Sequence, residues 1–407
     1  MCYKFGCKAL LAFASFAAEP SFKTQRVFEG DTGGHKVYRI PGIVATKKGT
    51  ILAYTEARRT GLGDWDSIDI VLRRSTNGGV TFSPQRVIAQ APGKVERSPV
   101  AVERKQGNPG DITYNNPVAI ADRNGSVHFL FCLEYMRAFY MRSDDDGQTF
   151  SEPVEITSAF EAFRPEYAWR VLATGPGHGI QLANGRLLVP VWLALGTGGN
   201  GHHPSVNATI YSDDHGATWH RGQIAVPNTP EFPDPNETGA VQLADGSVML
   251  NVRTEAKENR RAVVISKDGA GSWTAPRFQD DLPDPICFAS VVRFSTKKTG
   301  GKNRLLFVNP DNLARADGKD TRSKDRVNLT VRLSYDEGAH WTVKRVIEPG
   351  ATGYSDLAVM PDGSVLCLYE VVVPGADGKP RHDEMLARFN LEWLTEGKDT
   401  LKKGRLY

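Results

Sequence analysis

The sequence predicts an all-β fold, a six-bladed β-propeller made of four-stranded antiparallel sheets. Three observations carry this prediction: a recurring octapeptide, a recurring hairpin, and weak helical periodicity along the chain. Radial repetition of small sheets gives a propeller, because one such unit cannot bury both faces alone and must pack on its neighbours. A pair of β-sandwiches is the alternative fold for the same pattern.

The octapeptide follows the pattern S-x-D-x-G-x-T-W/F, with occasional replacements. In such a turn the Asp side chain accepts hydrogen bonds from backbone N–H groups, the Gly adopts a left-handed conformation, and the aromatic side chain anchors the turn in an apolar layer. We therefore interpret the motif as a structural turn rather than as a calcium or sugar site. Its five copies are Ser75–Phe82, Ser143–Phe150, Ser212–Trp219, Ser266–Trp273 and Ser334–Trp341.

The hairpin consists of two apolar strands around a turn that contains Gly, often as Asn-Gly or Asp-Gly. In most copies a further strand and the octapeptide follow, so the chain holds about six units. The copies are Ile43–Thr55, Val118–Cys132, Ile180–Leu193, Val241–Arg253, Leu357–Glu370 and a degenerate one at Ser290–Asn309. We expect residues 24–30 and 387–394 to share the last unit and close the ring. No linker interrupts the pattern, so we expect a single domain over residues 22–407.

The composition excludes several function classes. The 407 residues are 40% hydrophobic and 24% charged, which is typical of a globular protein rather than of a disordered chain. A net charge of +3 is too small for an electrostatic nucleic-acid binder. No run of 18 apolar residues is present, so no membrane span is expected. We expect a monomer.

The N-terminus has the pattern of a signal peptide over residues 1–18. Lys4 and Lys8 precede the apolar stretch 9–18, and small residues occupy positions suited to a signal peptidase. A secreted or periplasmic location is therefore expected. An ordinary N-terminal helix is the alternative.

The five cysteines form no CxxC pair, so a thiolate zinc site is not expected. Cys132, Cys287 and Cys367 each lie in an apolar stretch and are predicted to be buried small hydrophobes. The spacing of His178, His202 and His203 fits no zinc motif. We expect neither a metal nor a cofactor.

Several residues interrupt the repeats and carry chemical groups. Tyr38-Arg39-Ile40-Pro41 opens the first hairpin, where an arginine has no packing reason to lie. Together with the octapeptides, which are the Asp-box turns of that family, this element resembles the exo-α-sialidase (neuraminidase) family, of the bacterial type with BNR repeats. The resemblance extends from about residue 24 to the end. It includes Glu56-Ala57-Arg58, Gly63-Asp64-Trp65-Asp66, 175–180, Asn236-Glu237, Asn251-Val252-Arg253, 326–330 and Gly353-Tyr354-Ser355.

The resemblance implies that Arg39, Arg253 and Arg326 hold the carboxylate of sialic acid. A planar guanidinium matches a carboxylate with two parallel donors, which lysine cannot do. Arg332 competes with Arg326 for the third role. Arg332 alternates into a strand that leads to Ser334, so we assign it to blade structure.

The resemblance further implies that Tyr354 is the nucleophile and Glu237 its base. A carboxylate nucleophile would be repelled by the carboxylate of the sugar, whereas a neutral phenol is not. A phenol of ordinary pKa about 10 needs a nearby base and cations to become nucleophilic.

Asp64 is implied as the general acid/base, with Asp66 and Asp69 as nearby competitors. Arg58 resembles the arginine at the sugar 4-hydroxyl. Asn116 occupies a place where several family members have Asp, so recognition of that hydroxyl differs in detail. We read the glycine-rich stretch 196–201 as a rim over the site.

The resulting expectation is a retaining exo-α-sialidase that removes terminal α-linked sialic acids from glycoproteins, glycolipids and oligosaccharides. Sialylated glycans would be its partners. A trans-sialidase or an intramolecular trans-sialidase is one alternative, because these differ only in what attacks the intermediate. The other alternative is a non-catalytic, glycan-binding propeller with the same turns.

Overall fold

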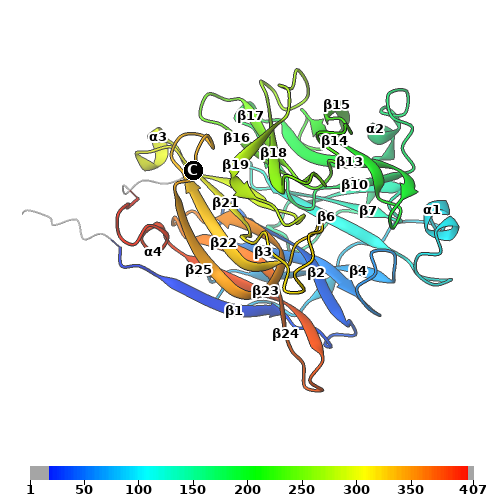
Figure 1. The fold of residues 1–407 in the computed structure, drawn as a ribbon, viewed down its shortest axis with the longest axis horizontal. Helices are drawn as coiled ribbons and strands as arrows, with labels where there is room; N and C mark the ends of the chain where they lie inside the picture. The colour runs from blue at the N-terminus through cyan, green and yellow to red at the C-terminus, as the bar shows by residue number, and fades with distance from the viewer. Residues whose placement is uncertain (1–17, 402–407) are drawn as a thin grey trace, which may run out of the picture.

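The structure is a computed structural model that describes residues 18–401. The signal peptide expected over residues 1–18 lies, except for its last residue, outside the described residues. Residues 18–401 form 25 strands in five sheets with four short helices, arranged in a propeller-like way (Figure 1). The all-β prediction is confirmed. No helix in this part of the chain has the length and apolar character needed to cross a membrane.

The sheets follow one another along the chain, and most strands are antiparallel to their neighbours. The first, in the order β2-β3-β4-β5, has β2 (Val37–Ala45), β3 (Ile51–Arg58), β4 (Ile68–Ser75) and β5 (Arg86–Val87). The second, β11-β6-β7-β8-β9, has β6 (Tyr114–Ala121), β7 (Val127–Leu133), β8 (Arg137–Ser143), β9 (Val154–Glu155) and the short parallel β11 (Gly177–His178). The third has β10 (Val171–Thr174), β12 (Ile180–Gln181), β13 (Leu187–Gly198), β14 (His203–Ser212) and β15 (His220–Val226). The fourth has β16 (Thr238–Gln242), β17 (Val248–Val252), β18 (Arg260–Ser266) and β19 (Arg277–Pro283).

The fifth sheet has seven strands in the order β1-β25-β24-β23-β22-β21-β20. They are β20 (Ser290–Ser295), β21 (Arg304–Pro310), β22 (Val327–Ser334), β23 (Val343–Val359), β24 (Val365–Pro374), β25 (Pro380–Phe389) and β1 (Phe22–Phe28). The helices are α1 (Pro99–Glu103), α2 (Thr157–Glu161), α3 (Lys297–Gly300) and α4 (Leu391–Leu394).

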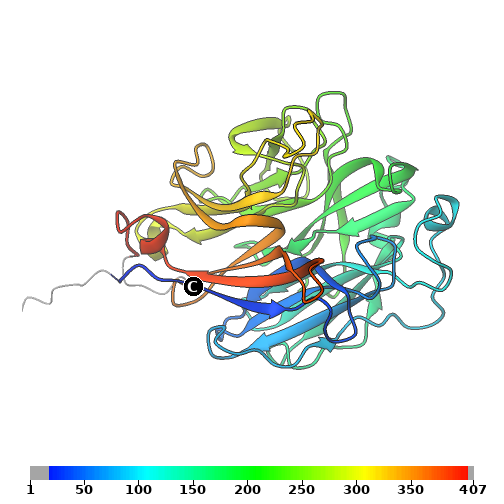
Figure 2. The ribbon, with the colours of Figure 1, turned by 60° about the horizontal axis from the view of Figure 1, so that its bottom comes forward.

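The long strand β23 explains the size of this sheet. Its first half, up to Ala351, pairs with β22, and its second half, from Thr352, pairs with β24. One strand therefore belongs to two groups of four. The two ends of the described chain meet in the second group, where Phe22 of β1 pairs with Phe389 of β25 (Figure 2). The prediction that the two ends share a sheet is confirmed for β1 and β25, but residues 391–394, which are predicted to lie in the same unit, form α4 instead.

The octapeptide turns have the predicted geometry. In the third copy the Ser212 hydroxyl accepts a 2.8 Å hydrogen bond from Gly216 N, and Asp214 accepts a 2.9 Å bond from Thr218 N. The first, second and fifth copies repeat both contacts. The φ of Gly216 is +88°, a left-handed conformation that only Gly adopts easily. The terminal Trp219 is 7% exposed and packs into the core.

Apolar layers fill the spaces between neighbouring sheets. Tyr54 of β3 packs edge-on against Phe129 of β7, which joins the first sheet to the second. Leu130 of β7 and Val189 of β13 belong to the cluster between the second and third sheets. Sheet-to-sheet packing of this kind holds the first strand of each unit toward a common centre.

The three cysteines of the described chain are buried and free. Burial raises the pKa of each thiol, to about 11 for Cys132 and about 12 for Cys287. They therefore remain protonated, as predicted for cysteines that pack as small hydrophobes.

The inner strands leave two hollows along the centre of the molecule. One, of about 220 Å³, lies where β2 and β23 carry Arg39 and Tyr354. The other, of about 880 Å³, lies toward the opposite ends of the same strands, beside Ala45 and Val359, and has mostly apolar walls. The chemical groups predicted from the sequence gather at the smaller hollow.

Candidate active site

β-Bulges lie at the site end of three inner strands. The register shifts at Arg39–Gly42 in β2, at Asn115–Val118 in β6 and at Thr352–Ser355 in β23. Ile40 and Asn116 have φ of +63° and +51°, which is costly for side-chain-bearing residues and above all for a β-branched one. A bulge re-aims the side chains next to it. Arg39, Asn116 and Tyr354 thereby all reach the small hollow.

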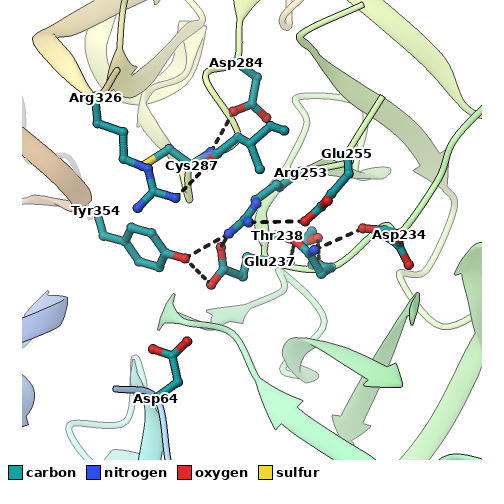
Figure 3. Close-up of polar contacts among 12 residues, drawn as sticks. Asp64, Asp234, Glu237, Thr238, Arg253, Glu255, Asp284, Cys287, Arg326 and Tyr354 are labelled. Atoms are coloured by element: carbon teal, nitrogen blue, oxygen red, sulfur yellow. Dashed lines mark hydrogen bonds and ion pairs between the residues drawn. The ribbon is translucent and has the colours of Figure 1, made fainter. Parts of the chain in front are cut away.

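The hollow brings together most of the predicted site residues. Its wall contains Arg39, Asp64, Asn116, Glu237, Arg253, Arg326 and Tyr354, and it does not contain Arg58. These residues come from segments as far apart in sequence as the first and the last hairpin. Figure 3 shows Tyr354, Glu237 and Arg253 in mutual contact, with Asp64 facing them from the other side.

Tyr354 and Glu237 are joined by a short hydrogen bond in the hollow. The phenol hydroxyl donates a 2.5 Å hydrogen bond to Glu237 Oε1, and both residues are less than a tenth exposed. Arg253 Nη1 donates to Glu237 Oε2 and, at 2.9 Å, to the phenol oxygen. Burial, followed by the charge of Glu237, raises the pKa of Tyr354 strongly, against the lowering effect of the arginines. The phenol is therefore neutral in the free protein and has an acceptor for its proton in place.

Three arginines surround the Tyr354 side chain. The guanidinium carbons of Arg39 and Arg326 lie 5.4 and 5.2 Å from the centre of its ring, and Arg253 contacts its oxygen. Burial works to lower the pKa of each guanidinium, but neighbouring groups outweigh it and raise the pKa. These are chiefly Glu370 for Arg39, Glu237 for Arg253, and Cys287 and Tyr354 for Arg326. All three stay charged, which makes the hollow suited to an anion such as a carboxylate.

The competing arginine lies elsewhere. Arg332 is 2% exposed and is held within its sheet by Asp311, at 2.7 Å, and by Asn309, at 2.9 Å. Its pKa is lowered, mainly by burial. Arg326 thus lines the hollow, whereas Arg332 lies within the sheet, and the role of Arg326 in binding a carboxylate stays a prediction.

Asp64 lies in the loop between β3 and β4, opposite Tyr354. One carboxylate oxygen accepts from Arg58 Nη1 at 3.0 Å, and the other accepts from Asn200 Nδ2 at 3.0 Å. Burial acts to raise the pKa of Asp64, but Arg58 and then His202 and Arg39 outweigh it and hold the pKa at about 2. Asp64 is therefore ionised in the free protein. Asn200 belongs to the glycine-rich stretch, which thus lies at the rim as predicted.

Arg58 and Asn116 differ in their access to the hollow. Arg58 has no exposed surface and lies behind Asp64, held by Glu56 Oε2 at 2.8 Å. It orients Asp64, and its contact with a sugar hydroxyl stays a prediction. Asn116 lines the hollow, and its backbone N–H donates to Glu56 at 2.9 Å. One buried carboxylate thus fixes both neighbours.

Sequence reasoning missed Glu370. This residue interrupts the apolar run of β24 and accepts from the backbone N–H groups of Ile40 at 3.0 Å and Tyr354 at 3.2 Å. Its Oε1 also lies 3.3 Å from Arg39 Nε. A Cβ on Gly353 would lie 2.0 Å from Glu370 Oε2, so a larger residue there would displace this carboxylate. A carboxylate inside an apolar hairpin strand was the one signal that could have revealed it.

An aromatic wall, also missed, closes one side of the hollow. Tyr135, Trp192 and His202 line it, and their ring centres lie 4.7 to 6.1 Å apart. Burial lowers the pKa of His202 to about 4, so its imidazole is neutral. Trp192 Nε1 is buried without a hydrogen-bond partner. The wall therefore offers a mainly aromatic surface to the hollow.

One set of metal-type side chains lies close together in the described residues. His203, Asp234 and Glu255 offer atoms within 4.8 Å of one another. The ion pair with Asp234 raises the pKa of His203, and Glu255 adds to this against the effect of burial. The two carboxylates thus stabilise the protonated form of His203, which places positive charge between them. His178 is engaged by Asp356 at 2.7 Å on the central axis.

Comparison with known proteins shows which family the chain belongs to. Residues 98–367 match the BNR repeat-like domain family. The chain is 32% identical to a sialidase of Micromonospora viridifaciens over 92% of its length, and 30% identical to a sialidase of Bacteroides fragilis over 82%. It spans 55% and 60% of the length of these two relatives. The chain belongs to the BNR-repeat sialidase family.

A solved structure of similar fold is the intramolecular trans-sialidase from Ruminococcus gnavus in complex with oseltamivir carboxylate. The TM-score is 0.71 and the identity 19%, and the match covers 91% of this chain and 98% of the other. The likeness supports the propeller-like fold.

Proposed function

We propose that this protein is a retaining exo-α-sialidase that acts on terminal α-linked sialic acids of glycoproteins, glycolipids and oligosaccharides. The observation that carries the proposal is the 2.5 Å hydrogen bond between Tyr354 and Glu237 inside a cluster of three arginines. The arginines suit a ligand carboxylate, and the neutral phenol beside them is a nucleophile that such a carboxylate does not repel.

The first step forms a covalent bond between Tyr354 and the sugar. Glu237 takes the phenol proton as the oxygen attacks the anomeric carbon, and the bond to the leaving oxygen breaks. The charges of Arg253, Arg326 and Arg39 favour the developing phenolate. The leaving oxygen takes a proton from Asp64.

Asp64 is ionised in the free protein, so substrate binding has to raise its pKa before it can act as an acid. Arg39 Nη1 lies 3.8 Å from Asp64 and is one of the groups that lower this pKa. A substrate carboxylate on Arg39 brings negative charge beside Asp64 and offsets part of that effect. The substrate thus promotes protonation of its own catalytic acid.

The second step releases the sugar. Asp64, now a carboxylate, accepts a proton from water, the water oxygen attacks the anomeric carbon, and the bond to Tyr354 breaks. Glu237 returns the proton to the phenolate. Two inversions at one carbon give net retention. The cycle needs no cofactor.

The architecture belongs to the proposal as well. Counting β23 as the outer strand of one blade and the inner strand of the next divides the seven-stranded sheet into two blades and gives six in all. We propose one catalytic domain over residues 22–407, active as a monomer. A secreted or periplasmic location follows from the signal-peptide pattern.

The proposal is tested by incubating the protein with 3′- and 6′-sialyllactose and analysing the products. Free sialic acid with lactose is the expected result. A 2,7-anhydro sugar or a sialylated acceptor would instead show an intramolecular or intermolecular trans-sialidase. Binding without turnover would show the non-catalytic alternative.

A further inference from the structure

A row of alternating charges runs from Asp234 through His203 and Glu255 to Arg253, and two of its members, His203 and Arg253, line the hollow. His203 Nδ1 lies 3.3 Å from Asp234 Oδ1, and His203 Nε2 lies 3.6 Å from Glu255 Oε1. The same Glu255 oxygen lies 3.8 Å from Arg253 Nη2. Figure 3 shows Glu255 and Asp234 on the side of Arg253 opposite Tyr354. The row thus ends on Arg253, one of the three arginines that are proposed to bind the carboxylate of the substrate.

The two amino groups of Arg253 face different partners. Nη1 donates to Glu237 and Tyr354, whereas Nη2 has Glu255 as its nearest anionic neighbour. A ligand carboxylate that binds Arg253 bidentately needs Nη2 and therefore competes with Glu255. The distance of 3.8 Å is too long for a hydrogen bond, so Glu255 lies close to Nη2 without closing on it.

His203 decides how strongly Glu255 attracts Arg253. A protonated imidazole beside Glu255 offsets its charge and leaves Nη2 available. A neutral imidazole leaves Glu255 without this compensation, and Glu255 then draws Nη2 away from the ligand. Asp234 is anchored by the backbone N–H of Ser205 at 3.1 Å, so the imidazole is held from behind.

We propose that His203 is a positioning residue whose imidazolium, held between Asp234 and Glu255, keeps Arg253 free to bind the carboxylate of the substrate. The proposal rests on the proposed function, because it concerns one of the three arginines that are proposed to bind the carboxylate of the substrate. It predicts that carboxylate binding weakens as His203 loses its proton.

The pKa of His203 also depends on the other charged and titratable groups near it. Arg253 disfavours the imidazolium, but Asp234 and Glu255 outweigh it, so the pKa of His203 is raised above its ordinary value of 6.5. The adjacent His202 is neutral, and Arg322 donates to the Glu255 carbonyl at 3.2 Å. Tyr167 donates to the Pro204 carbonyl at 2.8 Å and is neutral, because burial raises its pKa. The imidazolium therefore persists to a higher pH than that of an ordinary histidine and is lost as the pH rises above this raised pKa.

The test measures kcat/KM for a sialoside from about pH 5 to about pH 9 in the wild type, His203→Gln, Glu255→Gln and the double variant. We expect an alkaline decline in the wild type, carried mainly by KM. His203→Gln should lack this decline and bind about fivefold more weakly at neutral pH, the upper range for a partly exposed ion pair. The double variant should regain the lost affinity, because the neutral amide introduced by Glu255→Gln no longer competes for Arg253. His220→Gln, at an exposed site away from the hollow, should keep the wild-type profile.

The same series is titrated by calorimetry with 2-deoxy-2,3-didehydro-N-acetylneuraminic acid, a non-hydrolysable carboxylate ligand. The expected result is the same pH dependence of Kd and the same rescue in the double variant. A Kd that still rises with pH in His203→Gln, or a double variant that binds as weakly as His203→Gln, would overturn the positioning role while leaving the sialidase proposal intact. A protein that neither binds this ligand nor cleaves any sialoside would overturn both.

Discussion

The hydroxyl of Tyr354 and the carboxylate of Glu237 lie 2.5 Å apart, although the two residues are 117 positions apart in the sequence. Burial and the charge of Glu237 keep the phenol protonated. The pair is therefore a poised acid and base, and proton transfer has to accompany attack on the sugar.

Removing either member of this pair should abolish most turnover. Tyr354→Phe should lower kcat by about 10³-fold or more, and Glu237→Gln by about 10²- to 10⁴-fold, because neither variant can generate the phenolate. The double variant should be no worse than Tyr354→Phe, since the two act as one unit. The matched control is Tyr369→Phe. Tyr369 is a buried tyrosine of β24 in an apolar cluster that does not include Tyr354, so this variant should keep the wild-type kcat. Wild-type kcat in Glu237→Gln would rule out Glu237 as the base.

The arginine clamp predicts a clear contrast between two neighbouring arginines. Arg326→Ala should lower kcat/KM by about 30- to 1000-fold, or on the order of 2–4 kcal/mol, because a charge-assisted carboxylate contact is lost. Its Tm should change little. Arg332→Ala should lower Tm, because it breaks the buried pair with Asp311, while the folded protein keeps its kcat/KM. The reverse result would show that the third arginine of the clamp is misassigned.

Asp64→Ala should distinguish substrates by their leaving groups. A natural glycoside needs protonation of its leaving oxygen, whereas an aryl leaving group departs with little help. We expect kcat for sialyllactose to fall by about 10²-fold or more and kcat for an aryl sialoside to fall far less. Equal losses on both substrates would remove Asp64 from the acid role.

The octapeptide turns should contribute to stability alone. Ser212→Ala leaves the N–H of Gly216 without its 2.8 Å acceptor in a buried position, so unfolding should cost about 1–3 kcal/mol less. Urea denaturation measures this loss. Ser158→Ala, at an exposed position in α2, is the control and should change stability little. A lower kcat/KM in folded Ser212→Ala would contradict a purely structural role.

The features that could be predicted from the sequence are those that depend on contacts between residues close together in the chain. The octapeptide turns close within eight residues, so their pattern alone determines the bonds of Ser212 and Asp214. The choice of Arg326 over Arg332 followed from strand alternation. The contacts of Glu370 could not be predicted, because they depend on a bulge in β2 and on the packing of β24 beside it. The burial of Arg58 likewise depends on how the loop with Asp64 folds back over it.

The most direct test of the proposed mechanism is to trap the covalent intermediate on Tyr354. A 3-fluoro-sialosyl fluoride should give a long-lived adduct, because its 3-fluorine slows both steps while the fluoride leaving group keeps the first step possible. Peptide mass spectrometry should locate the sugar on the peptide that contains Tyr354, and proton NMR of normal turnover should show the α-anomer released first. A label on another residue, or the β-anomer as first product, would contradict the mechanism.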